Sequence, residues 1–383
     1  MAWGKVDVDE QRMRFVIAAS RKEKPLRQLC QEFDISPPTG YKWRDRYQAG
    51  GLQAVVEKSR RPQRSPHRTD PEMEQRVVGL RQQRPDWGAR KLQVLLQREG
   101  IRLPCITIHR ILLRHQLVRS QDRHAAAVKR FERSQPNELW QMDFKSPVGW
   151  EAPAGPLSVL DDHSRYAVTL HGTWSTRAEP VRERLDGAFQ ECGVPEAMLV
   201  DHGTPWWNMK AISGATWLTL WLMKQGIRLY FSGYRHPQTQ GKVERFHGAL
   251  AAALQRRGYP DPQERQNWLD QFRHEYNHVR PHEALGMQTP ATVWRKSHRR
   301  YDPNPPRWEY EPGSEVVKVG GDGQIWIERQ RWEISRALAG EWVQLIRLEQ
   351  RILVYYCRSL VRELDQSSRR SLAVDWLSWS QQV

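Results

Sequence analysis

The run Leu139-Trp140-Gln141-Met142-Asp143-Phe144 places one acidic side chain inside a strand-like apolar stretch. A carboxylate is costly to bury without a partner, so Asp143 must line a site or meet a counter-charge. Further short apolar runs follow, and helical patterns separate the last three of them. Strands that come in succession and then alternate with helices predict a mixed α/β sheet for residues 137–294. The expected strands are 139–144, 157–160, 166–173, 197–200 and 227–231, and the expected helices are 178–191 and 217–224.

Two more acids stand where this sheet would present them. Asp201 directly follows the run 197–200, at the carboxyl end of a strand, where open α/β sheets place ligands. Glu244 lies near the start of a helical stretch from Gly241. Three carboxylates from different elements repel one another unless cations intervene, and oxygen ligands select magnesium or manganese. Two such ions roughly 4 Å apart stabilise both oxygens of a phosphodiester displacement, so the three acids predict metal-assisted phosphoryl transfer.

Basic charge is concentrated in the first third of the chain. Of the net charge of +16, residues 1–136 carry +14, from 29 Lys/Arg against 15 Asp/Glu. Such a region is a plausible footprint for a polyanion, because each neutralised phosphate releases counterions. A basic surface that only aids solubility is the alternative until folded motifs are found there.

A helix-turn-helix pattern lies within residues 8–56. Leu26, Leu29, Cys30 and Phe33 form one apolar helical face, and Ser36 is a candidate cap for a second helix. A basic second helix suits insertion into a DNA major groove, although a generic helical hairpin fits this segment about as well. The expected DNA contacts here are Thr39, Lys42 and Arg44, and those of the basic linker 57–70 are Arg60, Arg61 and Arg64.

The same pattern recurs in residues 71–120, before a linker at 121–136. Apolar stripes appear on two helical stretches, around Leu92 and around Ile108. Two such units in one basic chain favour DNA binding over the generic hairpin. The expected contacts are Arg90, Lys91, Thr107 and Arg110.

The C-terminal region, residues 307–366, has an all-β pattern. Five short strands are expected at 315–319, 325–334, 341–348, 351–356 and 359–365, with residues 320–323 as the first hairpin turn. These strands predict a small antiparallel barrel.

Other classes of protein are disfavoured. The sequence has no apolar stretch of the roughly 18 residues that a membrane helix requires, and its first residues lack a signal-peptide core. Its four cysteines lie far apart without a CxxC pair, which favours neither disulfides nor a cysteine-based zinc site. A cytoplasmic protein is expected.

Five motifs occur in order along the chain: Trp140-Gln141-Met142-Asp143, Val159 to Arg165, Leu199 to Gly203, His236 to Arg245, and Tyr276-Asn277 through His282. Together they resemble the bacterial insertion-sequence transposases that have a retroviral-integrase-type Asp-Asp-Glu core. The resemblance covers roughly residues 10–365 and implies a ribonuclease-H-like core in a protein associated with the bacterial nucleoid. It also implies that Asp143, Asp201 and Glu244 hold two Mg²⁺ ions, with Mn²⁺ as a substitute, in an enzyme that nicks element ends and joins them to target DNA.

Two features depart from the usual pattern of that family. Asp201 and Glu244 are 43 positions apart, more than the commonest spacing, and His202 stands where Asn is usual. The extra residues are expected in a loop at 206–215, on the rim of the site. The paired His and Cys of a retroviral zinc module are absent, so the resemblance implies no zinc.

Neighbouring polar residues have competing interpretations. Asp161 and Asp162 stand in an Asp-Asp-His-Ser turn, and we favour turn chemistry over a metal role for them. Gln240 and His247 share a helix face with Glu244 and are expected beside the DNA backbone, with a solvated surface as the alternative. Lys242 is expected to bind phosphate or to be solvated.

These features predict a transposase that binds terminal inverted repeats through its helix-turn-helix units. Bringing two ends together requires a homodimer or larger assembly. The alternatives are a DNA-binding regulator whose core has lost catalysis and a nuclease without joining activity.

Overall fold

The computed structural model describes residues 8–56, 69–118, 132–146, 154–173, 175–207, 214–231, 241–372 and 374. It divides the chain into two compact units, residues Met1–Asp70 and Pro71–Val383. The expected linker contacts Arg60, Arg61 and Arg64 and the expected contact Gln240 lie outside the described residues, as does most of the linker 121–136.

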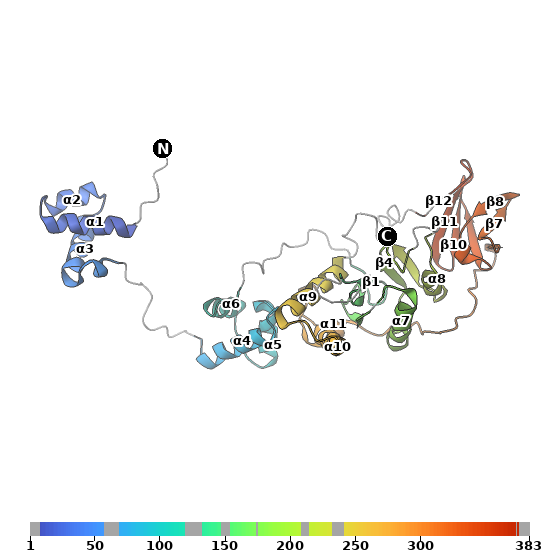
Figure 1. Ribbon diagram of the computed structural model, residues 1–383, viewed down its shortest axis with the longest axis horizontal. Helices are drawn as coiled ribbons and strands as arrows, with labels where there is room; N and C mark the ends of the chain where they lie inside the picture. Colours follow the sequence, from blue (N-terminus) through green and yellow to red (C-terminus); the bar gives the residue numbers. More distant parts are fainter. Residues whose placement is uncertain are drawn as a thin grey trace. The chain divides into compact units, whose positions relative to one another are not determined.

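The first unit is a bundle of three helices (Figure 1), α1 (Val8–Arg21), α2 (Leu26–Glu32) and α3 (Pro37–Gly50), followed by a 3-10 turn at Leu52–Val55. The Ser36 side chain caps α3 by accepting a hydrogen bond from the Thr39 backbone, as the sequence predicts. A Cβ at Gly40 would lie 2.4 Å from Cys30 Sγ, so only glycine lets α3 approach α2 this closely. Helix α1 was not predicted from the sequence.

The second unit begins with another three-helix bundle, made of α4 (Pro71–Gln83), α5 (Ala89–Arg98) and α6 (Cys105–Arg114). The two expected helices are α5 and α6, and α4 is an addition to the prediction. Their shared core includes Val77, Trp87, Leu92 and Ile108.

A mixed five-stranded sheet follows, in the order β3-β2-β1-β4-β5. Strands β1 to β3 are antiparallel, whereas β4 runs parallel to both β1 and β5. The predicted strands are confirmed to within two residues at each end. They are β1 (Trp140–Phe144), β2 (Leu157–Asp161), β3 (Ala167–His171), β4 (Ala197–Val200) and β5 (Arg228–Phe231).

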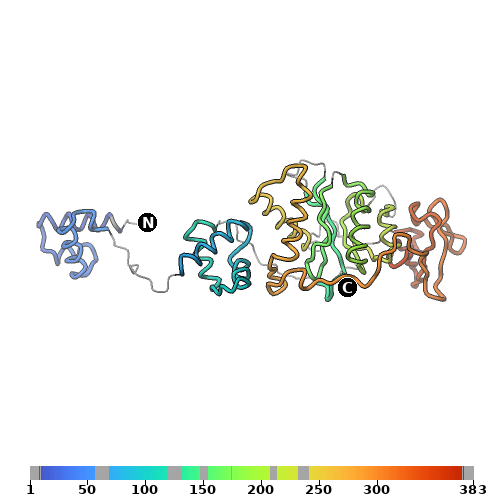
Figure 2. The backbone as a smooth tube through the Cα atoms, turned by 90° about the horizontal axis from the view of Figure 1, so that it is seen from below, coloured from blue at the N-terminus to red at the C-terminus, as the bar shows by residue number. Residues whose placement is uncertain are grey.

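Helices cover both faces of this sheet (Figure 2). Helices α7 (Ala178–Cys192) and α8 (Trp217–Lys224) share one apolar core with the sheet. On the opposite face, α9 (Gly241–Arg257) and α10 (Arg265–His274) share a second core with Leu160, Ala167 and Leu170. A π-helical turn at Glu275–Val279, a 3-10 turn at Glu283–Leu285 and α11 (Pro290–Val293) complete this part of the chain.

The C-terminal region forms two antiparallel sheets. The larger has the order β12-β11-β10-β9-β6, from β6 (Glu315–Lys318), β9 (Trp342–Arg347), β10 (Arg351–Tyr356), β11 (Ser359–Asp365) and β12 (Arg370–Leu372). The smaller pairs β7 (Gln324–Ile327) with β8 (Gln330–Glu333).

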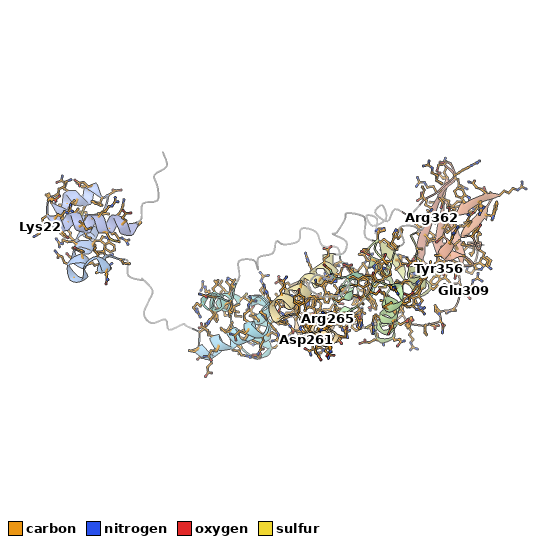
Figure 3. The ribbon with its side chains drawn as sticks, viewed as in Figure 1. Lys22, Asp261, Arg265, Glu309, Tyr356 and Arg362 are labelled. Carbon is orange, nitrogen blue, oxygen red and sulfur yellow. The ribbon has the colours of Figure 1, made fainter. Side chains whose placement is uncertain are left out.

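Three details of the C-terminal prediction were wrong. The expected strand 325–334 is a hairpin, because Glu328 and Arg329 both adopt positive φ and reverse the chain. The turn at 320–323 does not join paired strands, since β6 pairs with the distant β9. The region also extends beyond residue 366, because the buried Arg362 (Figure 3) donates to the Ser371 carbonyl at 2.9 Å and holds β12.

The described helices include none that is both long and apolar enough to cross a membrane.

Candidate active site

Two of the predicted acids come from adjacent parallel strands. Strands β1 and β4 pair Trp140 with Met198 and Gln141 with Leu199. Continuing this register by two residues brings Asp143, at the end of β1, opposite Asp201, just after β4. The parallel pairing of β1 and β4 therefore explains why acids so distant in sequence meet at one sheet edge.

Asp143 is in an unfavourable environment for a negative charge. Burial, and then the charges of Asp201 and Glu244, raise its pKa to about 7, while a hydrogen bond from the Phe144 backbone acts in the opposite direction. Asp143 is therefore within electrostatic range of the other two acids. Without a cation, the Asp143 carboxyl is partly protonated at neutral pH.

A tight turn fixes the Asp201 side chain. The Gly203 backbone donates to Asp201 Oδ1 at 3.0 Å. A Cβ at Gly203 would lie 2.9 Å from Asp201 Oδ2, so a larger residue would push the carboxylate away.

Helix α9 brings Glu244 and His247 to the same sheet edge. His247 Nε2 lies 3.0 Å from Ser158 Oγ on β2, and its Nδ1 lies 3.8 Å from Asp143 Oδ2. Burial, and secondarily the charge of Lys145, lowers the His247 pKa to about 4, so the imidazole is neutral at pH 7. Glu244, one turn earlier, is exposed to solvent. The site thus has two fixed carboxylates and a third that is open to solvent.

Aromatic side chains surround the residue that departs from the family pattern. The His202 ring lies 4.9 Å from Trp207 and 5.5 Å from Phe231, measured between centroids. Trp206 stacks on Phe144, next to Asp143. His202 therefore belongs to an aromatic cluster beside Asp201, formed in part by the start of the expected rim loop. Residues 208–213 of that loop lie outside the described part.

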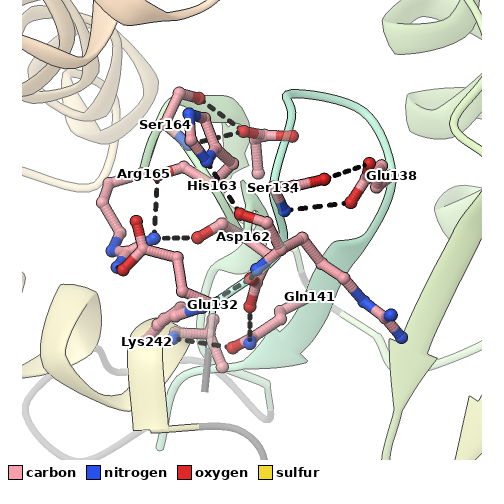
Figure 4. A network of polar contacts seen from close by, with 12 residues as sticks. Glu132, Ser134, Glu138, Gln141, Asp162, His163, Ser164, Arg165 and Lys242 are labelled. Carbon is pink, nitrogen blue, oxygen red and sulfur yellow. Dashed lines mark hydrogen bonds and ion pairs between the residues drawn. The ribbon is translucent and has the colours of Figure 1, made fainter. Parts of the chain in front are cut away.

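The Asp161-Asp162 pair is a structural turn, as the sequence favours. Both side chains are fully buried. Asp161 accepts hydrogen bonds from the Asn137 and Ser164 backbones at 2.7 and 2.8 Å, while Asp162 accepts one from the Arg133 backbone at 2.8 Å (Figure 4). Hydrogen bonds within the protein therefore engage both carboxylates, as in a structural turn.

Several expected DNA contacts have protein partners instead. Lys242 Nζ lies 2.5 Å from Asp162 Oδ2, and its side chain is only 12% exposed. His247 is buried against Ser158, so the solvated alternative for it was wrong. Arg90 pairs with Glu283 at 3.2 Å, and Lys91 is largely buried, with a pKa lowered to about 8 by burial and then by Arg280. DNA contact by Lys242, His247 and Lys91 would require these arrangements to open, whereas the Arg90 ion pair is open to solvent.

The remaining described DNA contacts lie on the third helix of each bundle, α3 and α6. Lys42 and Arg110 are exposed, while Thr39, Arg44 and Thr107 are partly exposed. Arg44 contacts Asp45 at 2.7 Å, a pair open to solvent. These five side chains are available to a ligand.

The donor set at the sheet edge suits a divalent metal. The charges of Asp201 and Glu244 help to raise the pKa of Asp143, a cation would relieve that repulsion, and the hard carboxylate oxygens match Mg²⁺ or Mn²⁺. Among the described residues, no three acids, histidines or cysteines are drawn together closely enough to form a metal-binding group. The fit thus rests on the chemistry of the donors and on their repulsion.

Three family matches agree with this architecture. Residues 11–63 match a helix-turn-helix domain, residues 39–112 a homeodomain-like domain, and residues 225–290 an integrase core domain. An uncharacterized 31.7 kDa protein of insertion element IS407 from Burkholderia multivorans is 27% identical over 224 residues, covering 56% of this chain and 78% of that protein. An uncharacterized 39.2 kDa protein of IS476 from Xanthomonas euvesicatoria is 26% identical over 227 residues, covering 56% and 62%.

The chain thus contains helix-turn-helix and integrase core domains, and it is similar to proteins of insertion elements. The integrase match ends within α11 and includes Glu244 but neither aspartate. The helix-turn-helix and homeodomain-like matches fall on the two three-helix bundles and imply DNA binding.

Solved integrase structures also resemble parts of this chain. The HTLV-2 integrase catalytic core in complex with magnesium is 14% identical, with 42% of this chain and 97% of that chain covered and a TM-score of 0.32. The simian T-cell lymphotropic virus intasome in complex with a PP2A regulatory subunit is 15% identical, with 72% and 91% covered and a TM-score of 0.36. These scores are too low to carry an argument about this chain.

Sequence reasoning missed the residues that connect the sheet to the start of α9, the helix that contains Glu244. Gln141 and Ser158 contact α9 from β1 and β2, and Asp162 holds Lys242. The only signal for them was a polar residue at a buried strand position, which does not reveal its partner.

Proposed function

We propose that this protein is a magnesium-dependent transposase that cuts the 3′ ends of its element and joins them to target DNA. The observation that carries the proposal is the meeting of Asp143 and Asp201 at the edge of β1 and β4, with α9 bringing Glu244 into their electrostatic range. Three acids of this kind suit the displacement of one phosphodiester oxygen by another.

Asp143, Asp201 and Glu244 would hold two Mg²⁺ ions, for which Mn²⁺ can substitute. When bound, the ions act as Lewis acids that activate a water or a 3′-hydroxyl and stabilise the leaving oxygen. The protein's part is to keep its own groups in position. Gly203 orients the Asp201 carboxylate, and the neutral His247 occupies the space beside Asp143 without adding a competing charge.

The helix-turn-helix domains would recognise the terminal inverted repeats. Exposed Lys42 and Arg110, with Thr39, Arg44 and Thr107, are the described side chains best placed to contact DNA. Two ends must meet for joining, so we propose a homodimer or larger assembly on DNA.

We propose that the predicted domain limits hold except at the C-terminus, where β12 extends the last domain to Leu372. In that domain the two antiparallel sheets would together form the predicted small barrel. Closure is supported by the shared core that includes residues of β7 to β11.

Three outcomes of one assay separate the proposal from its rivals. The full chain is incubated with labelled element ends, a supercoiled plasmid and Mg²⁺. Joined products support the transposase, nicks alone would indicate a nuclease, and bound complexes alone would indicate a DNA-binding regulator. Asp143→Asn should abolish joining and leave the binding of element ends in a gel shift intact. Full joining by this variant would refute the assignment of Asp143 to the active site.

A further inference from the structure

A buried polar network joins β1, the turn after β2 and the start of α9 (Figure 4). Its members are Gln141 on β1, Asp162 in the turn after β2, and Lys242 in the first turn of α9. Gln141 is 1% exposed and Asp162 is fully buried. Gln141 and Lys242 each stand two positions before a proposed metal ligand, Asp143 and Glu244 respectively.

Gln141 joins β1 directly to α9. Its Oε1 accepts a hydrogen bond from the Val243 backbone at 3.2 Å, and its Nε2 donates to Asp162 Oδ1 at 2.8 Å. The first backbone N–H groups of a helix have no partner within the helix, so the Gln141 side chain supplies one of the missing acceptors. The donor and acceptor ends of the amide are both engaged, which fixes its orientation.

Asp162 connects the same two elements through charge. Its Oδ2 lies 2.5 Å from Lys242 Nζ and also accepts a hydrogen bond from the Arg133 backbone at 2.8 Å. Arg165, in the same turn, donates to the Asp162 carbonyl and pairs with Glu132 at 3.0 Å. An ion pair this buried has well-defined geometry, because its charges depend on each other and on nearby hydrogen bonds.

The network sets the position of one proposed ligand relative to another. Gln141 and Asp143 lie on the same strand, and Lys242 and Glu244 lie in the same helical turn. Val243 contacts β1 and Lys242 contacts the turn at Asp162, so these contacts limit where the Glu244 backbone can lie relative to Asp143. Glu244 itself is exposed, so without this constraint little else among its described contacts would direct it towards the aspartates.

We infer that Gln141, Asp162 and Lys242 are positioning residues, which hold the start of α9 so that Glu244 can complete a divalent-cation site with Asp143 and Asp201. The inference rests on the proposed function, since it requires that site. It also assigns Lys242 to the protein interior instead of to the phosphate contact that its charge suggested.

Metal binding by the full chain tests this inference without relying on turnover. Mn²⁺ is titrated and the free ion is measured by EPR, for wild type, Lys242→Met, Asp162→Asn and the double variant. Loss of such supporting contacts weakens metal affinity by about tenfold or more, and we expect that loss in all three variants. The double variant should lose no more than either single variant, because both singles break the same contact.

Single variants leave a buried charge unpaired and can lower stability for that reason alone. The double variant removes both charges, so its thermal melting separates a folding defect from a positioning defect. A double variant that melts like wild type and still binds Mn²⁺ weakly supports positioning. One that melts like wild type and binds Mn²⁺ with wild-type affinity overturns the inference.

Arg245→Met is the matched control, because Arg245 is an exposed cation in the same helical turn. It should leave Mn²⁺ affinity unchanged. Gel shifts in EDTA should show wild-type DNA affinity for Lys242→Met, and a variant that loses DNA affinity while keeping Mn²⁺ affinity would identify Lys242 as a DNA contact instead. Wild-type protein that binds no Mn²⁺ would overturn the proposed metal site itself. Variants that bind Mn²⁺ with wild-type affinity would instead overturn only the positioning role.

Discussion

Replacing Asp143 with asparagine should stabilise the metal-free protein and remove the stabilisation that divalent cations give. Asparagine has nearly the same shape but no charge, so the repulsion from Asp201 and Glu244 disappears. The Asp143 pKa is raised from 3.8 to about 7, chiefly by burial. At about 1.4 kcal/mol per tenfold change in proton affinity, the charged form destabilises the fold by about 4 kcal/mol at most.

The sign of the pH dependence follows from the raised pKa. The folded state binds the Asp143 proton more tightly than the unfolded state does. The destabilisation of the wild-type fold by the Asp143 charge is therefore absent below the pKa that Asp143 has in the unfolded state. It grows as the pH rises from about 4 to about 7 and is complete above that. The variant should therefore match wild type at pH 4 and exceed it in stability at pH 8.

Urea denaturation in EDTA at both pH values measures this difference, and a repeat with Mg²⁺ measures linkage to the metal. The control is Asp261→Asn, at an exposed carboxylate (Figure 3), which should change neither result. Equal stability of Asp143→Asn and wild type at pH 8 in EDTA would refute the claim that the Asp143 charge destabilises the metal-free fold. Equal stabilisation of the two by Mg²⁺ would refute Asp143 as a ligand.

Three further changes test the packing and the DNA interface. Asp86→Asn should lower the free energy of unfolding by about 3 kcal/mol in urea denaturation, because this buried carboxylate pairs with Arg257 at 2.9 Å. Gly155→Ala should lower the melting temperature, since the new Cβ would lie 1.8 Å from the Lys145 carbonyl, and a wild-type melt would contradict that close approach. Arg110→Ala should weaken binding to the inverted repeats and reduce the salt slope in fluorescence titrations by about 1, whereas an unchanged slope would exclude a phosphate contact.

Local patterns predicted most of the sheet and two of its helices. The strands β1 to β5 each bury apolar residues between turn residues, so their sequence alone marks them, and α8 begins and ends where its pattern does. Asp143 stood out because it interrupts such a run, and Asp201 because it ends one. Their proximity needed only the rule that parallel strands present their carboxyl ends together.

What the sequence could not show depends on contacts between distant elements. Lys242 resembles any solvated or phosphate-binding lysine until the turn at Asp162 folds against it. Helices α1 and α4 were not predicted; each is stabilised by packing within its bundle, through Phe15 in α1 and Val77 in α4, which the sequence alone does not show. The hairpin of β7 and β8 was read as one strand, since apolar residues continue on both sides of Glu328 and Arg329.

The central claim is that Asp143, Asp201 and Glu244 together hold the metal ions of DNA strand transfer. The most direct measurement is an anomalous difference map from crystals of the full chain with element-end DNA and Mn²⁺. We predict anomalous peaks in contact with all three carboxylates and with the phosphate to be cut. Ordered density for these side chains and the DNA end, with no peak among them or with Mn²⁺ bound elsewhere, would contradict the account.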